Sequence, residues 1–479
     1  MRKKRTTAGV YLLVALLAVI ASAYGWVYRD FAQDDAFITY RYARNIAQGR
    51  GFVYNRGEPV LGTTSPCYTL WLAALGKLSN QDIRLLSHWT SVVSLWLAAV
   101  VLYTLGRPAN LLQATAMAVI YITNPILGWS MGMETCFLIL FLLLVIMSYV
   151  QDKLILSGAL MGILVLIRYE AVLLAFILAV HYTIERRRLP TWLAAGVPFI
   201  AAWGLYAWGT FGTIIPHSAS AKLVASRVPF VVGALVYSRL FINHNTLFVP
   251  VIPLVAAGGF RAVRTWDWRP GFLLVLTWSV VYFVAASLVA GAFPWYYGPL
   301  VPAFAILVVW GCALVAAGLA PLLGRLERLS RPKGAAHSVL LILAIAMLTG
   351  LQVDAWRMPG TGRLGQKVDP RYTVYREAAE WLNQHAEKSD TLAAPEIGVL
   401  GYYTDMRIID LYGLVTPELA PRRDEDITTT LEKATQLYAP DYVISDKEGL
   451  LQFMEQSPLF RRVRSFGDGS HVLYEDARD

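Results

Sequence analysis

Long apolar runs constrain this chain more than any other feature. VYLLVALLAVIASAYGWV begins at residue 10, and CFLILFLLLVIMSYV begins at residue 136. A helix of about 20 apolar residues crosses the hydrocarbon core of a bilayer. Apolar residues make up 56% of the 479 residues and charged residues only 16%, which excludes an ordinary soluble globular chain. The sequence therefore predicts a polytopic α-helical membrane protein.

About eleven runs are predicted to span the bilayer, and several are shorter than 20 residues. They lie near residues 9–27, 83–105, 109–128, 135–150, 154–167, 171–184, 191–209, 246–258, 271–290, 298–320 and 338–353. The run at 9–27 is expected to be a span rather than a cleaved signal peptide, because Ala21-Ser22-Ala23 falls inside the apolar stretch.

Lys and Arg collect in alternate loops, which predicts the orientation. The basic loops contain residues 2–5, Arg107, Lys153, residues 185–188, Arg261, Arg264, Arg269 and residues 325–333. Loops 129–134 and 291–297, on the other side, contain neither residue type. We therefore expect a cytoplasmic N-terminus in the plasma membrane, with a first loop (28–82) and the segment after residue 353 outside.

Charge separates two predicted domains. Residues 354–479 contain 15 Lys and Arg against 22 Asp and Glu, whereas residues 1–353 contain 27 against 11. The positive excess thus belongs to the membrane part, and no nucleic-acid partner is implied. The tail reads as a small extracytoplasmic α/β domain: residues 371–388 have a helical pattern, and 390–413, 442–446 and 471–476 include strand-like runs.

The cysteines and histidines say little about chemistry. Cys67, Cys136 and Cys312 are odd in number and far apart, so isolated apolar residues are favoured over a Cys67–Cys136 disulfide. The seven His are scattered, which argues against a His-based metal site.

Two adjacent carboxylates, Asp34 and Asp35, follow the first apolar run. Such a pair is costly to desolvate beside a membrane, which indicates a chemical use for at least one of them. They open a predicted amphipathic helix that would lie in the membrane interface with its carboxylate end free. The alternative is an ordinary helix cap, for which Asp is a favoured residue.

Residues 33–66 resemble the first extracytoplasmic loop of the GT-C glycosyltransferases, polytopic enzymes that take a sugar from a polyprenyl-phosphate lipid. The resemblance is to a bacterial branch that includes the mycobacterial arabinofuranosyltransferases. The matching residues are Asp34, Asp35, Ile38, Arg41, Tyr42, Ala43, Asn45, Gly49, Gly51, Asn55, Gly57, Glu58, Gly62, Thr64, Ser65 and Pro66. Leu61 departs from the pattern, which usually has an acidic residue there.

The resemblance implies a GT-C-like catalytic domain over 1–353, with Asp34 as the base that deprotonates the acceptor. Asp35 would then orient the acceptor or bind a divalent cation, or the two roles are reversed. A partly buried carboxylate beside a second one has a raised proton affinity, which suits a base. No cofactor is certain from the sequence, and a divalent cation is the one candidate.

Donor-phosphate contacts are predicted at Arg168, His217, Lys222 and Arg41. Arg168 interrupts an apolar run in IRYE, where the family has R-P-E, and Glu170 is its nearest partner. A structural ion pair between those two residues is the alternative. His217 and Lys222 lie in FGTIIPHSASAK, which resembles the family's FGxxxPNTxxAK loop, and Lys222 alternatively snorkels to the interface. Arg41 follows Asp34 by two helical turns, and alternatively contacts lipid headgroups.

Acceptor or sugar contacts are predicted at Glu134, Glu170, Trp295 and Tyr296. Glu134 lies in a GMET sequence like one in the family, or is a helix-dipole partner. Trp295 and Tyr296 would stack on sugar or belong to the interfacial aromatic belt.

The resemblance therefore implies transfer of a sugar from a polyprenyl-phosphate donor to a cell-envelope glycan, lipid or protein. The alternatives are a transporter or flippase of a lipid-linked or anionic substrate, and a binding-only role for the tail. Against transport, the charges gather at span ends, and the sequence contains no evident inverted repeat.

Overall fold

The computed structural model describes residues 2–31, 33–217, 229–244, 251–266, 271–288, 293–324, 335–356, 370–420 and 425–477. The chain forms two compact units. The helical unit comprises residues 1–31, 88–200 and 229–367, and the mixed unit comprises residues 32–87, 201–228 and 368–479. The mixed unit therefore combines the predicted first loop with the predicted C-terminal domain.

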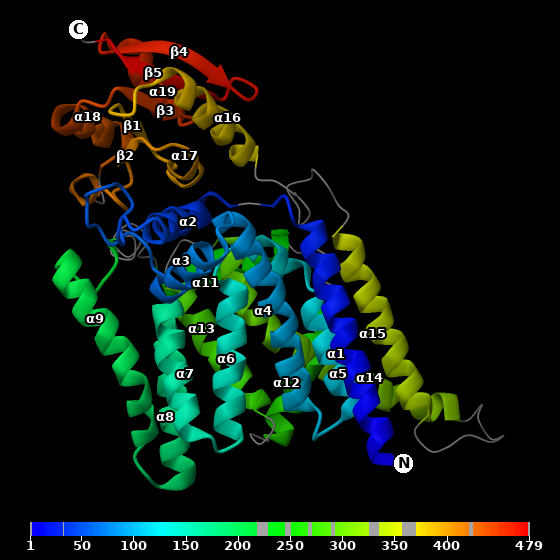
Figure 1. Cartoon of the computed structure of the whole chain (residues 1–479). Helices are drawn as coiled ribbons and strands as arrows, with labels where there is room; N and C mark the ends of the chain where they lie inside the picture. Colours follow the sequence, from blue (N-terminus) through cyan, green and yellow to red (C-terminus); the bar gives the residue numbers. More distant parts are fainter. Residues whose placement is uncertain are drawn as a thin grey trace. The chain divides into compact units, whose positions relative to one another are not determined.

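Long apolar helices make up the helical unit (Figure 1). Its helices, some of which extend across the boundary of the unit, are α1 (Arg2–Val27), α4 (Ile83–Gly106), α5 (Leu111–Ile122), α6 (Thr135–Val150), α7 (Leu154–Ile167), α8 (Val172–Arg186), α9 (Val197–Phe211), α11 (Phe230–His244), α12 (Ile252–Thr265), α13 (Phe272–Ser287), α14 (Val301–Gly324) and α15 (Ala335–Ala355). Short 3-10 turns connect several of them: η1 (Pro125–Ser130), η2 (Tyr169–Ala171), η3 (Thr191–Gly196) and η5 (Pro294–Leu300).

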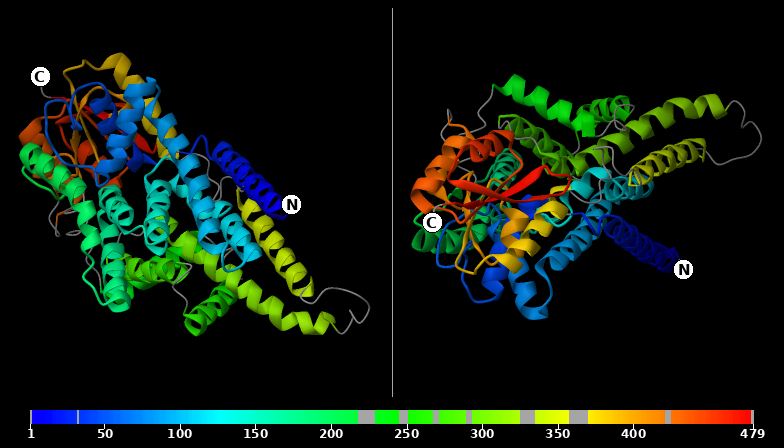
Figure 2. Two further views of the ribbon diagram at one scale, coloured as in Figure 1. Left: turned by 60° about the horizontal axis from the view of Figure 1, so that its bottom comes forward. Right: turned by 90° about the horizontal axis from the view of Figure 1, so that it is seen from above.

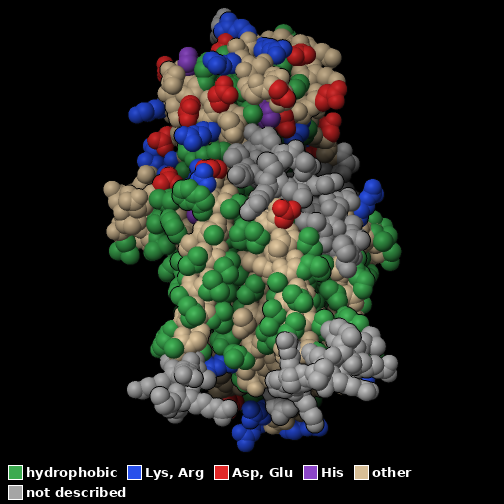
Figure 3. Space-filling view, turned by 90° about the vertical axis from the view of Figure 1, so that its right-hand side faces the viewer, with side chains coloured by type: hydrophobic (Ala, Val, Ile, Leu, Met, Phe, Trp, Pro, Cys, Tyr) green, Lys and Arg blue, Asp and Glu red, His purple; other side chains and the backbone are tan. Residues whose placement is uncertain are grey.

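These helices confirm the predicted polytopic helical class. Within the described residues, the segments long and apolar enough to cross a membrane are Ala8–Val27, Ile83–Gly106, Trp295–Ala320 and Ala336–Ala355. Shorter apolar helices are Leu111–Ile122, Thr135–Val150, Leu154–Ile167 and Phe272–Ser287. Hydrophobic side chains cover the face of the helices shown in Figure 3, as expected of a surface in contact with lipid. The number of spans stays a prediction.

Glycines let helices α12 and α14 approach closely. A Cβ on Gly258 would lie 2.0 Å from the carbonyl oxygen of Leu307, and one on Gly311 would lie 2.0 Å from that of Leu254. Any larger residue would push the helices apart. Small residues at such crossings are typical of membrane helices, which gain their association energy from close van der Waals contact.

The mixed unit contains a five-stranded sheet. Its strands are β1 (Thr391–Ala394), β2 (Arg407–Asp410), β3 (Tyr442–Ser445), β4 (Phe460–Phe466) and β5 (His471–Asp476), in the order β2-β1-β3-β5-β4. β1 pairs in parallel with β2 and β3, whereas β5 pairs antiparallel with β3 and β4. The helices of the unit are α2 (Asp34–Ala47), α3 (Pro66–Ser79), α16 (Pro370–His385), α17 (Gly398–Tyr403), α18 (Ile427–Tyr438) and α19 (Glu448–Gln456), with the short turn η6 (Pro417–Leu419). The predicted small α/β domain is thus confirmed.

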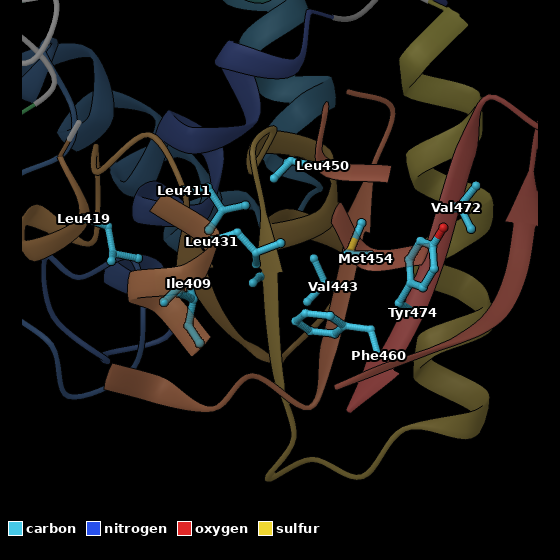
Figure 4. Close-up of a cluster of buried hydrophobic side chains, with 12 residues drawn as sticks. Ile409, Leu411, Leu419, Leu431, Val443, Leu450, Met454, Phe460, Val472 and Tyr474 are labelled. Atoms are coloured by element: carbon cyan, nitrogen blue, oxygen red, sulfur yellow. The ribbon is translucent and has the colours of Figure 1, made fainter. Parts of the chain in front are cut away.

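Helices α18 and α19 cover the sheet with apolar side chains (Figure 4). Leu431 of α18 and Met454 of α19 are fully buried in one cluster with Val443 of β3 and Tyr474 of β5. Helix α16 packs along β4, and it lies beside the strands in both views of Figure 2. The last three residues of β1, β2 and β3 are all buried, as expected for parallel strands that are covered on both faces.

Asn55 joins the first loop to the edge strand β2. Its Nδ2 donates to the carbonyl oxygen of Ile408 at 2.9 Å, and its Oδ1 accepts from the Ile408 N–H at 3.0 Å. The side-chain amide therefore pairs with the free edge of β2 as a neighbouring strand would. Covering an edge in this way protects it from pairing with other chains.

The three cysteines are free thiols, with Cys136 and Cys312 buried and Cys67 partly buried. This confirms the interpretation as isolated small residues and contradicts the alternative disulfide.

Candidate active site

Asp34 lies at the start of α2, which begins where the sequence predicts it, with Gln33 rather than an Asp at its N-cap. The Asp34 residue is 3% exposed. Its Oδ2 accepts the N–H of Gly398 at 2.9 Å, and its Oδ1 accepts the N–H of Val399 at 2.8 Å. The expectation of a free carboxylate end is therefore wrong for Asp34, because helix α17 of the tail covers it and supplies two donors.

Gly398 is required for this contact. A Cβ at this position would lie 1.8 Å from the carbonyl oxygen of Asp34, and one at Gly401 would lie 1.9 Å from the Tyr54 hydroxyl. Both glycines lie on the face of α17 that packs against α2 and its loop. Figure 1 shows α17 next to α2. The two helices can therefore approach until backbone N–H groups of α17 reach the Asp34 carboxylate.

Three carboxylates from distant segments meet at this end of α2. Carboxylate oxygens of Asp34, Asp35 and Glu396 all lie within 4.8 Å of one another. Asp35 and Glu396 are partly exposed, whereas Asp34 is buried. Glu396 follows strand β1 and was not predicted as a site residue. The only cue in the sequence is an acidic residue directly after a strand-like run, a position where α/β sheets often bind ligands.

Burial dominates the protonation of this cluster. It raises the pKa of Asp34 to about 6; the hydrogen bonds from Val399 and Gly398 oppose the shift, and the charge of Asp35 adds to it. Burial likewise raises the pKa of Glu396 to about 7, with Asp34 raising it further and Arg371 lowering it. The pKa values of both carboxyl groups therefore lie closer to neutral pH than those of free carboxyl groups.

Two cations flank the acidic cluster. Arg371 Nη1 lies 3.1 Å from Glu396 Oε1, and Lys447 Nζ lies 3.9 Å from the same oxygen. The three carboxylates offer the hard oxygen ligands that Mg²⁺, Mn²⁺ or Ca²⁺ prefers, so this is where a divalent cation could be held.

Arg41 stabilises the fold of the mixed unit. It is 3% exposed, and it donates hydrogen bonds of 2.8 Å to the carbonyl oxygens of Tyr54, Gly401 and Met406. These bonds join α2 to its own loop and to the tail. The predicted contacts with a donor phosphate or with lipid headgroups are therefore not assigned to Arg41, because its guanidinium is buried under backbone carbonyls.

The two loops that resemble the family are connected. The His217 N–H donates to the carbonyl oxygen of Leu61 at 2.9 Å. Leu61, the departure from the family pattern, has a fully buried side chain. Lys222 lies outside the described residues, so its predicted contact with the donor phosphate stays a prediction.

A second charged group lies within the helical unit, around Arg168 at the end of α7. Arg168 Nε lies 3.2 Å from Glu134 Oε1 and 3.2 Å from Glu170 Oε1. The ring centroid of Tyr296 lies 5.1 Å from the guanidinium carbon. The Glu170 partner matches the expectation, and Glu134 is an additional one. Arg168 Nη1 is buried without a hydrogen-bond partner among the described residues.

The aromatic residues of η5 differ in exposure. Trp295 is 6% exposed and stacks on Phe293 with the ring centroids 4.6 Å apart, whereas Tyr296 is partly exposed. Tyr296 is thus the better placed of the two to contact a sugar.

The predicted site residues divide between the two compact units. Asp34, Asp35, Arg41 and His217 belong to the mixed unit. Glu134, Arg168, Glu170, Trp295 and Tyr296 belong to the helical unit.

Comparisons with known proteins identify relatives at several levels. A family model described as a domain of unknown function (DUF8728) matches residues 366–475. A terminal β-(1→2)-arabinofuranosyltransferase of Mycobacterium tuberculosis is 28% identical over 293 residues, which are 55% of this chain and 46% of that protein. The chain thus matches less than half the length of that relative.

Solved structures share the fold. ArnT from Cupriavidus metallidurans, bound to undecaprenyl phosphate, superimposes with a TM-score of 0.63 over 98% of both chains at 15% identity. The Archaeoglobus fulgidus oligosaccharyltransferase, in its apo form, superimposes with a TM-score of 0.56 over 91% of this chain and 69% of that one, at 11% identity.

Proposed function

We propose that this chain is a glycosyltransferase of the GT-C superfamily, and that it transfers a sugar from a polyprenyl-phosphate donor to a hydroxyl group of a cell-envelope acceptor. We place the transfer at the outer face of the plasma membrane, because the distribution of Lys and Arg predicts that the first loop lies there. The similarity to ArnT, whose structure contains bound undecaprenyl phosphate, supports the donor class. The mycobacterial relative makes arabinofuranose the first sugar to test.

The carboxylate cluster at the start of α2 carries this proposal. A base must reach the acceptor hydroxyl. Asp34 is buried with both oxygens bonded to the N–H groups of α17, whereas Asp35 is partly exposed beside it. We therefore assign the base to Asp35, the reverse of the order that the resemblance favours, and the positioning of α17 to Asp34.

The reaction is a single displacement with inversion. The acceptor oxygen forms a bond to the anomeric carbon while its proton passes to Asp35. The bond between the anomeric carbon and the phosphate oxygen breaks, and the polyprenyl phosphate leaves with the electron pair. Positive groups that hold the departing phosphate lower the barrier, because negative charge grows on its oxygen in the transition state. Lys222 is proposed for this role.

The Arg168 group is proposed to bind sugar hydroxyls within the helical unit. The Arg168 guanidinium pairs with two carboxylates, those of Glu134 and Glu170. The group therefore has no net positive charge to attract a phosphate. Carboxylates accept hydrogen bonds from sugar hydroxyls, and Arg168 Nη1 has a donor that no described residue accepts. A partly exposed aromatic ring, Tyr296, lies beside them.

A divalent cation held by Asp34, Asp35 and Glu396 would also help to activate the acceptor hydroxyl. It would lower the proton affinity of a bound acceptor hydroxyl. Dialysis against EDTA, followed by return of Mg²⁺ or Mn²⁺, tests this directly. Activity that persists in EDTA would leave proton transfer to Asp35 alone.

The function is tested with membranes from cells that overproduce the chain. They are supplied with radiolabelled polyprenyl-phosphate sugars, beginning with arabinofuranose and mannose, and with an envelope glycan fraction from a deletion strain. Label should pass from the lipid to the glycan, and Asp35→Asn membranes should show almost none. Label that crosses the membrane but stays on the lipid would favour the transporter alternative.

A further inference from the structure

The carboxyl ends of strands β1 and β3 form a topological switch point. β1 lies between β2 and β3, so the chain leaves β1 toward one side for β2 and returns on the other side for β3. Loops diverge at such a point, and parallel α/β sheets bind ligands there. Glu396 follows β1, and Asp446 with Lys447 follows β3.

Tyr375 brings a buried hydroxyl to this polar region. The residue, on α16, is 0% exposed, and its hydroxyl has no hydrogen-bond partner among the described residues. Burial raises the pKa of this hydroxyl, and the carboxylates of Asp446, Glu396 and Asp34 raise it further. The ring of Tyr375 also contacts His471, whose Nε2 lies 3.9 Å from Asp446 Oδ2.

His471 adds a second group with unused bonding capacity. Its ring meets that of Tyr375 edge to face, with centroids 4.9 Å apart. It is 6% exposed, and no described residue forms a hydrogen bond with its Nε2, which lies 3.9 Å from Asp446 Oδ2. Buried polar atoms in native proteins nearly always have partners. The Tyr375 hydroxyl and His471 Nε2 therefore each have capacity for a further hydrogen bond.

The charges around these two groups select the class of partner. Asp34, Asp35, Glu396 and Asp446 outnumber Arg371 and Lys447, which disfavours a phosphate or carboxylate ligand. A sugar hydroxyl both donates and accepts, so it can bond to a carboxylate and to a phenol at once.

We propose that Tyr375, His471 and Glu396 bind hydroxyl groups of the acceptor sugar, so that residues 370–477 form the acceptor-recognition domain of the enzyme. This rests on the proposed function. It explains why a tail from the far end of the sequence supplies a carboxylate beside Asp35: the domain that recognises the acceptor also presents the reacting hydroxyl to the base.

Tyr375→Phe tests the proposal, because it removes the hydroxyl and keeps the ring. Full-length chain is assayed with the labelled donor and the envelope glycan fraction as acceptor. We expect the apparent KM for the glycan fraction to rise roughly fivefold, the scale of one lost neutral hydrogen bond. The KM for the donor, the slow release of sugar to water and the melting temperature should not change.

Tyr474→Phe is the matched control. Its hydroxyl donates to Glu455 at 3.3 Å, in another part of the same domain, so neither KM should change. Glu396→Gln should reduce transfer to the glycan more than it reduces release to water. An unchanged glycan KM in Tyr375→Phe would overturn the proposal and leave the hydroxyl as an internal orphan. A wild-type chain that transfers no label would instead count against the proposed function.

Discussion

The carboxylate of Asp34 accepts a hydrogen bond from the backbone N–H of Val399 at 2.8 Å, across 365 positions of sequence. The first loop and the tail are therefore parts of one folded unit. This contact distinguishes the two members of the acidic pair: Asp34 bonds to the backbone of α17, and Asp35 is the residue that we propose as the base.

Asp35→Asn and Asp34→Asn should fail in different ways. Asp35→Asn should lower turnover by roughly a hundredfold or more, the scale of a lost general base, with an unchanged melting temperature. Asp34→Asn should lower both, because an amide can accept only one of the two N–H groups of α17 and presents its NH₂ to the other. Turnover of the donor and thermal unfolding in detergent measure the two effects.

The opposite pattern, with full activity in Asp35→Asn and a hundredfold loss at unchanged stability in Asp34→Asn, would return the base to Asp34. Asp152→Asn serves as the control, since Asp152 forms an exposed ion pair with Arg186 in the helical unit.

Stability should depend on pH through Glu396. Burial raises its pKa from 4.5 to about 7 in the folded chain, so the folded state holds this proton more tightly than the unfolded state. The free energy of unfolding should therefore fall as the pH rises from about 4.5 to about 7. Glu396→Gln removes this titration. Its melting temperature should rise relative to that of the wild type across the same window, and a constant difference would contradict the assignment.

Arg168→Ala should destabilise the chain. It leaves Glu134, which is 6% exposed, without its cation, and breaking a buried ion pair costs about 3 kcal/mol or more. Adding Glu134→Gln should recover part of this loss. Thermal unfolding of the purified variants provides the measurement. Arg186→Ala, which breaks an exposed pair with Asp152, should shift the melting temperature little; an equal shift in both would argue against a buried charge cluster.

Lys222→Ala should weaken donor binding and slow transfer at unchanged thermal stability. A cation that holds the departing phosphate acts in the complex and more strongly in the transition state, so kcat and the donor KM should both change. Kinetics with varied donor concentration separate the two. Lys153→Ala, in a loop predicted to be cytoplasmic, is the comparison variant. Equal kinetics in the two variants would show that Lys222 only reaches the lipid headgroups.

Reporter fusions test the orientation. A reporter that is active only outside the cytoplasm should be active when it is fused after residue 360. A reporter that is active only in the cytoplasm should be active when it is fused after residue 187. Both follow because Lys and Arg concentrate in the loops that are predicted to be cytoplasmic. Inverted activity at both positions would put the carboxylate cluster on the cytoplasmic side of the membrane. This result would contradict the proposed site, because the acceptor lies outside.

The sequence by itself determined the features that depend on neighbouring residues. Apolar runs predict helices α6, α7 and α13 close to their observed bounds, because each helix satisfies its own backbone groups and needs no distant partner in lipid. The start of α2 at Asp34 and the mixture of helices and strands in the tail follow from local patterns in the same way.

Only the tertiary structure decided which of these residues meet. Glu396 joins Asp34 and Asp35 because Gly398 lets α17 approach α2, and nothing in either segment encodes the other. Arg41 was predicted to contact a ligand, yet its guanidinium donates hydrogen bonds to the carbonyl oxygens of Tyr54, Gly401 and Met406. The contacts of buried side chains depend on the packing of segments that lie hundreds of residues apart. That packing depends on shape and on the satisfaction of buried polar groups in three dimensions, which no local pattern of residues records.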